Sequence, residues 1–264
     1  MNLGLHQKKA LVTGSTAGIG LAIATGLAAE GASVIVNGRT PARVDQALQT
    51  IRTAHPSASL TGIAADVGTE AGIAELVKRA DPLDILVNNA GIFEPKPFLE
   101  ISDADWLRFF EMNVLSGIRL TRAFLPGMLK KNWGRVIFIS SESGLQIPAE
   151  MIHYGMTKTA QLAVSRGLAE SVAGTGVTVN AVLPGPTNSE GVGGFVDQLA
   201  KSQKKTKAEI EKEFFATMRP SSVIKRFATT DEVAAMVVYV CSEAASATTG
   251  AALRVDGGVV RSIA

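Results

Sequence analysis

The chain has 264 residues, of which 46% are hydrophobic and 19% charged, and its formal net charge is +2 at pH 7. This length and apolar content suffice for one good core, and the near-neutral charge excludes the basic excess of a nucleic-acid-binding protein. The single cysteine, Cys241, excludes an intramolecular disulfide. The first residues lack the apolar stretch of a signal peptide, and no apolar run approaches the ~18 residues of a membrane span. We therefore expect a cytoplasmic protein without a membrane partner.

In the first half of the chain, short apolar runs alternate with longer amphipathic segments. The runs predict strands at residues 9–13, 33–37, 60–65 and 83–87. Helices are predicted between them at residues 19–30, 41–54 and 70–79. Gly31 is a stop signal for the first of these helices, and Pro41 suits the first turn of the second.

The second half continues the alternation. Strands are predicted at residues 135–140, 177–183 and 252–256, and helices at residues 103–130, 154–173 and 231–242. Pro126 is expected to interrupt the first of these helices. Continuous apolar strands indicate a parallel sheet that is covered on both faces. With no linker or repeat, the pattern predicts α/β class: a single doubly wound (Rossmann) domain over residues 1–264, with a seven-stranded parallel sheet and helices on both faces.

One long segment departs from this alternation. About forty residues, 184–227, separate the sixth strand from the last helix, and they include glycines 191, 193 and 194. The mixed charges of residues 201–213 are typical of a solvated helix face rather than of a nucleic-acid site. Long insertions in compact domains are usually lids or disordered segments. We expect residues from about 186 to 227 to cover the substrate, and residues 188–219 to be mobile without ligand.

The segment TGSTAGIG, residues 13–20, joins the first strand to the first helix. This placement suits a phosphate, because a helix N-terminus offers free N–H groups and the positive end of the helix dipole. Gly14 would permit a tight turn, Gly18 the approach of a pyrophosphate, and Gly20 close packing of the helix on the sheet. The spacing differs from the commoner G-x-G-x-x-G, and a purely structural turn is the alternative.

Further polar residues follow the predicted strands. The segment NNAG, residues 88–91, follows the fourth strand, and Ser141 follows the fifth. Tyr154 and Lys158 open the next helix, and Asn113 lies midway along the predicted helix 103–130. Open α/β sheets bind ligands at the carboxyl ends of their strands. These residues are therefore predicted to form one site.

With these motifs the chain closely resembles the short-chain dehydrogenases/reductases, in the single-domain subgroup with TGxxxGIG and YxxxK motifs. The resemblance covers essentially the whole chain. It rests on residues 13–20, Asp66 and Val67, NNAG at 88–91, Asn113, Ser141, YGMTK at 154–158, Pro184, Gly185, Thr187, and VDGG at 255–258. No catalytic position departs from the family pattern. The T-G-x-x-G-x-x-G motif and second lobe of the epimerase and dehydratase relatives are missing.

Tyr154 and Lys158 are four residues apart, so both lie on one helix face. A tyrosine pKa of about 10 is too high for easy proton exchange at neutral pH, and we expect the neighbouring ammonium to lower it. Tyr154 is thus predicted to be the general acid of carbonyl reduction and the base of the reverse reaction. The resemblance further implies that Lys158 binds the nicotinamide ribose, Ser141 the substrate carbonyl oxygen, and Asn113 a water of a proton relay.

The end of the second predicted strand bears on the cofactor. Gly38 stands where relatives that use NAD typically have aspartate, and Arg39 suits the 2′-phosphate of NADP. We therefore predict NADP (NADPH); a solvent-exposed Arg39 and NAD are the alternative. The resemblance implies that Asp66 binds the adenine and that Asn88 lines the cleft. The predicted cofactor residues are Gly14, Ser15, Thr16, Gly18, Ile19, Gly20, Arg39, Asp66, Val67, Asn88, Ala90, Gly91, Tyr154, Lys158, Pro184, Gly185 and Thr187.

The sequence predicts an NADP-dependent oxidoreductase that acts on a small-molecule carbonyl or secondary alcohol. A 3-oxoacyl-(acyl carrier protein) reductase and a non-catalytic NADP-sensing regulator are the alternatives. The histidines, at positions 6, 55 and 153, lack ligand spacing, so no metal site is assigned. The resemblance implies a homodimer or homotetramer. Residues 94–99, 142–152 and 188–227 are expected to select the substrate, and we see in them no charge cluster that would name it.

Overall fold

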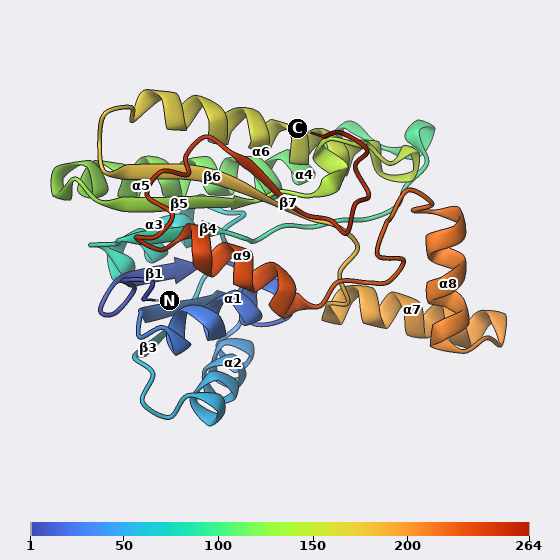
Figure 1. Cartoon of the computed structure of the whole chain (residues 1–264), viewed down its shortest axis with the longest axis horizontal. Coiled ribbons are helices and arrows are strands. Elements are labelled where there is room, and N and C mark those ends of the chain that lie inside the picture. The colour runs from blue at the N-terminus through green and yellow to red at the C-terminus, as the bar shows by residue number, and fades with distance from the viewer. Residues whose placement is uncertain (1, 264) are drawn as a thin grey trace.

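The computed structural model describes residues 2–263, with the side chains of residues 195–199 excepted (Figure 1). Residues 1 and 264 of the predicted domain lie outside the described residues. Within them, one seven-stranded parallel sheet has the order β3-β2-β1-β4-β5-β6-β7. The strands are β1 (Lys9–Val12), β2 (Ser33–Gly38), β3 (Leu60–Ala64), β4 (Ile85–Asn88), β5 (Gly134–Ile139), β6 (Val177–Pro184) and β7 (Ala252–Val255). The predicted fold class is confirmed.

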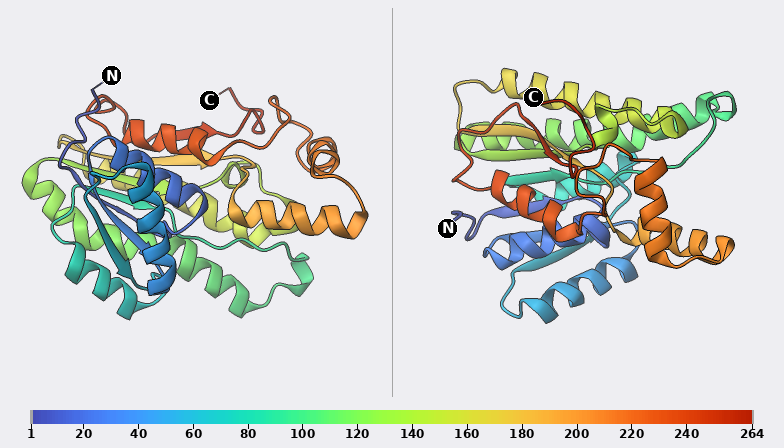
Figure 2. Two further views of the ribbon diagram at one scale, coloured as in Figure 1. Left: turned by 90° about the horizontal axis from the view of Figure 1, so that it is seen from below. Right: turned by 45° about the vertical axis from the view of Figure 1, so that its right-hand side comes forward.

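Helices cover both faces of this sheet (Figures 1 and 2). One core joins it to α1 (Gly18–Ala29), α2 (Pro41–Ala54) and α9 (Thr230–Val240). The other joins it to α3 (Glu70–Ala80), α5 (Ser116–Lys131) and α6 (Ile152–Ser171). Successive strand residues point to opposite faces, so Ala10 enters the first core and Leu11 the second. Both faces are buried, which explains why the strands are apolar without a break.

The predicted helix 103–130 is two helices, α4 (Asp103–Phe110) and α5, joined by a π-helical turn at Glu111–Leu115. The expected interruption at Pro126 is wrong, because this residue lies within α5. Pro126 is on the exposed side of α5, where water can bind the carbonyl that loses its helical hydrogen bond. The irregular turn instead holds Asn113, one of the predicted site residues.

The segment between β6 and α9 forms two helices, α7 (Glu190–Gln203) and α8 (Lys207–Thr217). They extend beyond the sheet at the end where its strands finish (Figure 2). A bridge between Thr187 and Ala228 joins the two ends of the segment at its base. We call residues 186–227 the insert. No helix within residues 2–263 combines the length and the apolar character needed to cross a membrane.

Candidate active site

A cleft of about 1110 Å³ lies at the carboxyl ends of the strands. Its walls come from the loop that follows β1, the loops after β4, β5 and β6, the start of α6, and the insert. The strand order reverses between β1 and β4, and such a reversal leaves a crevice in open α/β sheets. The topology therefore explains the position of the cleft.

The glycine loop closes one side of the cleft. Gly18 has φ +55°, and a Cβ there would have only the Cβ of Ser189 within 4 Å, at 3.3 Å. Gly20 packs tightly instead, since a Cβ there would lie 2.5 Å from the carbonyl oxygen of Gly14. No side chain caps the start of α1, and its first turn contains no acidic residue. The N–H groups of this turn are thus free to bind an anion.

Two arginines line the cleft beside this loop. Arg39 is exposed and forms no ion pair with any described residue. Arg43, on α2, was missed by the sequence analysis although it lies one helical turn further along. Its guanidinium donates to both carboxylate oxygens of Glu190, at 2.9 and 3.2 Å, so it ties α2 to the insert. A Cβ at Gly38 would lie 2.4 Å from Cγ2 of Thr16, which excludes aspartate there unless Thr16 moves.

The structure separates the predicted cofactor residues into two groups. Those that line the cleft are Gly18, Ile19, Gly20, Arg39, Gly91, Tyr154, Lys158, Pro184, Gly185 and Thr187. The remaining ones do not contribute to its described lining: Gly14, Ser15, Thr16, Asp66, Val67, Asn88 and Ala90.

In the second group, Ser15 and Asn88 are buried. Ser15 is buried and its hydroxyl donates to the carbonyl of Val12 at 2.7 Å. The side-chain amide of Asn88 donates to Thr121 on α5, at 3.3 Å, so it points away from the cleft. Asn89 is the residue that lines the cleft, and its amide donates to the carbonyl of Thr13 at 2.8 Å. The family motif alone does not show which of two adjacent asparagines faces the ligand.

Tyr154 and Lys158 lie one above the other on α6, with the Lys158 Nζ 5.5 Å from the centre of the tyrosine ring. The ammonium donates to the carbonyl oxygen of Ile139 at 2.9 Å and to Oε1 of Gln161 at 3.2 Å. Burial lowers the pKa of Lys158 to about 8, because a charged amine is disfavoured away from water. The ring of Phe93 packs edge-on against Tyr154.

The pKa of Tyr154 is above its ordinary value, contrary to our expectation. Burial of the phenol raises the pKa most, and the negative charge of Glu142 raises it further. The hydroxyl of Ser141 and the charge of Arg219 oppose this rise. The Lys158 ammonium, bound to a carbonyl and an amide oxygen, is not among the groups that lower the pKa in this state.

Asn113 connects the π-helical turn to its surroundings. Its side-chain amide donates to the carbonyl of Ile92 and to the hydroxyl of Thr157, both at 3.0 Å. Its backbone carbonyl accepts a hydrogen bond from Nε2 of Gln161 at 2.6 Å. Gln161 thus links Lys158 to Asn113 directly. The sequence analysis missed it, although its i+3 position relative to Lys158 is a usable signal.

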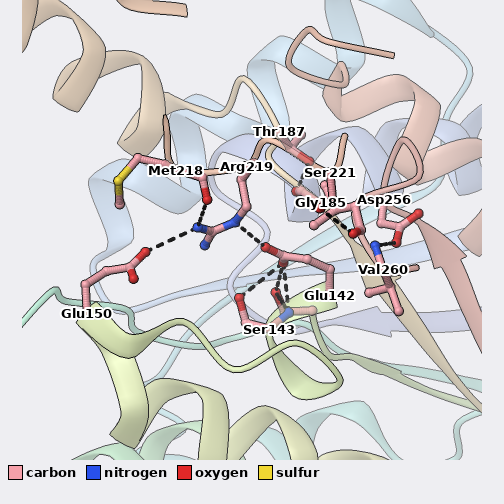
Figure 3. A network of polar contacts seen from close by, with 12 residues as sticks. Glu142, Ser143, Glu150, Gly185, Thr187, Met218, Arg219, Ser221, Asp256 and Val260 are labelled. Atoms are coloured by element: carbon pink, nitrogen blue, oxygen red, sulfur yellow. Dashed lines mark hydrogen bonds and ion pairs between the residues drawn. The ribbon is translucent and has the colours of Figure 1, made fainter. Parts of the chain in front are cut away.

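A cluster of charged side chains, Glu142, Glu150 and Arg219, lines the cleft (Figure 3). The hydroxyl of Ser141 donates to Oε2 of Glu142 at 2.6 Å, and Nε of Arg219 donates to Oε1 of the same carboxylate at 3.1 Å. Nη1 of Arg219 donates to Glu150 at 3.2 Å. The sequence analysis found in these segments no charge cluster that would name the substrate; the fold nevertheless brings these charged residues together, although they are far apart in the sequence.

No group of three or more His, Cys, Asp or Glu side chains within residues 2–263 is placed to hold a metal ion. His153, next to Tyr154 in the sequence, is buried, and its ring packs against Phe109 and Trp106. It points into the core formed with α4 rather than toward the cleft.

Comparison with known proteins agrees with this geometry. Residues 8–200 match the family model described as short chain dehydrogenase. The chain is 50% identical over 263 residues to the uncharacterized oxidoreductase YvaG of Bacillus subtilis, with 100% of both chains covered. It is 33% identical to the 3-oxoacyl-[acyl-carrier-protein] reductase FabG of Aquifex aeolicus, over 98% of this chain and 100% of that one.

Among solved structures, L-sorbose reductase from Gluconobacter frateurii, complexed with NADPH and L-sorbose, superimposes with a TM-score of 0.94. The two sequences are 31% identical, and the match covers 100% of both chains. The family model, the full-length relatives and the shared fold lead to one conclusion: the chain belongs to the short chain dehydrogenase family of oxidoreductases.

Proposed function

We propose that the protein is an NADP-dependent oxidoreductase that transfers a hydride between the nicotinamide and a carbonyl or secondary alcohol. One observation carries this proposal: Ser141, Tyr154 and Lys158 line the same cleft as the glycine loop. NADPH in the complex of the related L-sorbose reductase supports it.

The described residues fit a phosphorylated dinucleotide. The uncapped start of α1 and the positive φ of Gly18 in the lining of the cleft suit a pyrophosphate, and Arg39 suits a 2′-phosphate. When bound, the cofactor supplies or accepts the hydride. Tyr154 then gives its phenolic proton to the substrate oxygen during reduction, while the hydroxyl of Ser141 turns from Glu142, to which it donates in this structure, and donates to that oxygen instead. The ammonium of Lys158 can then return a proton to Tyr154, and Gln161, held by the backbone carbonyl of Asn113, positions that ammonium.

For the substrate, we propose a neutral carbonyl compound that carries hydroxyl groups. Arg219 is already shared between Glu142 and Glu150, so the cleft offers no unpaired cation there for an anionic substrate. Glu150 lines the cleft with its side chain 33% exposed, and its carboxylate accepts hydrogen bonds only, which favours hydroxyl donors. L-Sorbose, bound in the related reductase, is such a compound.

The test is NADPH oxidation on a panel of neutral ketoses, simple ketones, keto acids and 3-oxoacyl thioesters. We expect the ketoses to give the highest kcat/KM. Activity confined to the thioesters would favour the 3-oxoacyl-(acyl carrier protein) reductase suggested by the FabG relative. Tight NADPH binding without turnover on any carbonyl would favour a sensing regulator.

The insert is expected to close over the cofactor. Glu190 in the first turn of α7 already contacts Arg43 across the cleft, and Ser189 faces the glycine loop. Bound NADPH would bridge these walls, so amides of α7 should exchange with solvent more slowly in its presence. Hydrogen exchange with and without NADPH measures this, with the amides of β5 as the internal control. Equal exchange of α7 in both states would contradict closure.

A further inference from the structure

Figure 3 shows the ion pair between Glu142 and Arg219, which joins the insert to the residue that binds the hydroxyl of Ser141. Glu142 directly follows Ser141, whereas Arg219 comes from the segment after α8. Their side chains are only 6% and 10% exposed. A second pair in this part of the chain, Arg226 with Glu232, is 49% and 42% exposed. Exposed pairs contribute little, but a buried charge that loses its partner is strongly unfavourable.

Glu142 holds the hydroxyl of Ser141 in one direction. The serine hydroxyl has one proton, and it donates that proton to Oε2 of Glu142 at 2.6 Å. The backbone N–H of Ser143 donates to the same carboxylate oxygen at 2.9 Å and to Oγ of Ser141 at 3.1 Å. The other carboxylate oxygen accepts from Arg219. The position of the serine hydroxyl thus depends on Arg219 through Glu142.

The same two residues line the cleft together with Tyr154, and their charges act on its phenol in opposite directions. Besides burial, Glu142 raises the pKa of Tyr154 and Arg219 lowers it. The remaining groups that face the tyrosine are Ser141, the ring of Phe93, and Lys158 on its own helix. Glu150 binds the far side of Arg219 and completes the charged groups of this network.

We propose that Arg219 and Glu142 act as a positioning pair for proton transfer, in which Arg219 orients Glu142, Glu142 orients Ser141, and their balanced charges stand beside Tyr154. This inference rests on the proposed function, since it takes Tyr154 as the acid–base group. It assigns to the insert a role in the chemical step besides covering the substrate.

The test is the pH dependence of kcat for alcohol oxidation at saturating NADP, which requires the phenolate form of Tyr154 and therefore speeds up as pH rises through the pKa of Tyr154 in the cofactor-bound enzyme. Arg219→Gln leaves the Glu142 charge unbalanced, so the midpoint of the profile should move up by about one pH unit. Glu142→Gln removes the negative charge and should move the midpoint down by a similar amount. The double variant removes both charges and should return the midpoint toward that of the wild type.

Two comparisons make the test specific. Arg226→Gln removes an exposed arginine of the same segment and should leave the midpoint unchanged. Arg219→Gln leaves the buried carboxylate of Glu142 without its partner, and this variant can fail to fold for that reason. The comparison of Glu142→Gln with the double variant then replaces it, because these two proteins differ only in the charge at position 219. Arg219→Lys, which keeps the charge, should keep a midpoint close to that of the wild type.

The outcomes separate the two proposals. Wild-type turnover that Tyr154→Phe removes supports the proposed function. If that turnover is present but Glu142→Gln and the double variant share the wild-type midpoint, only the positioning pair is refuted. If Arg226→Gln shifts the midpoint as much as Arg219→Gln does, the pair is again refuted. Without any such turnover, the proposed function falls, and the positioning pair with it.

Discussion

Replacing Tyr154 with phenylalanine is expected to lower turnover by at least ~10²-fold, the loss typical of a missing acid–base group. The substitution keeps the ring and its edge-on contact with Phe93, but it removes the phenolic hydroxyl, which carries the transferable proton and interacts with Ser141. NADPH affinity should barely change. The measurement is kcat on a confirmed substrate, together with a cofactor titration.

The chain provides its own control for this experiment. It has two tyrosines, and the second, Tyr239, is an exposed residue on α9, outside the described lining of the cleft. Tyr239→Phe should therefore retain wild-type turnover. A Tyr154→Phe variant that works at nearly the wild-type rate would remove Tyr154 from the mechanism.

Replacing Arg39 with leucine is expected to weaken NADPH binding roughly ten- to hundred-fold. A charge-assisted hydrogen bond is worth about 1.5–3 kcal/mol, and each 1.4 kcal/mol is about a factor of ten in affinity. NADH lacks the 2′-phosphate, so its affinity should change little. Arg39 is favoured over Arg43 for this role, because the guanidinium of Arg43 is already held by Glu190.

Dissociation constants for both cofactors, measured at one salt concentration, test this assignment. Arg52→Leu, in the last turn of α2 and outside the described lining of the cleft, is the matched control and should change neither constant. An equal loss of NADPH and NADH affinity in Arg39→Leu would show that Arg39 does not bind the phosphate. A loss in Arg43→Leu alone would transfer the role to Arg43.

The fold class and the frame of the site could be predicted from the sequence, because both depend on local patterns. Continuous apolar strands separated by amphipathic helices specify a covered parallel sheet. The glycine loop and the i, i+4 relation of Tyr154 and Lys158 are contained in segments of eight and five residues. Such patterns constrain backbone geometry directly, so they needed no knowledge of distant contacts.

Long-range packing decided the side-chain directions, the place of the irregular helical turn and the pKa of Tyr154. In the tertiary structure, Asn88 points into the core and Asn89 lies at the cleft. The irregular helical turn contains Asn113 and not Pro126. The tertiary structure also determined the pKa of Tyr154, because burial depends on everything that surrounds the phenol.

The charge cluster is the clearest case. In the sequence, Glu142 and Arg219 are separated by 77 positions and belong to segments that show no common pattern. By itself, the sequence determined the sheet, the glycine loop and the residue types proposed for catalysis. Only the tertiary structure decided which charges meet at the catalytic hydroxyls, because the energy of a buried ion pair depends on distances and solvent exclusion that no local pattern encodes.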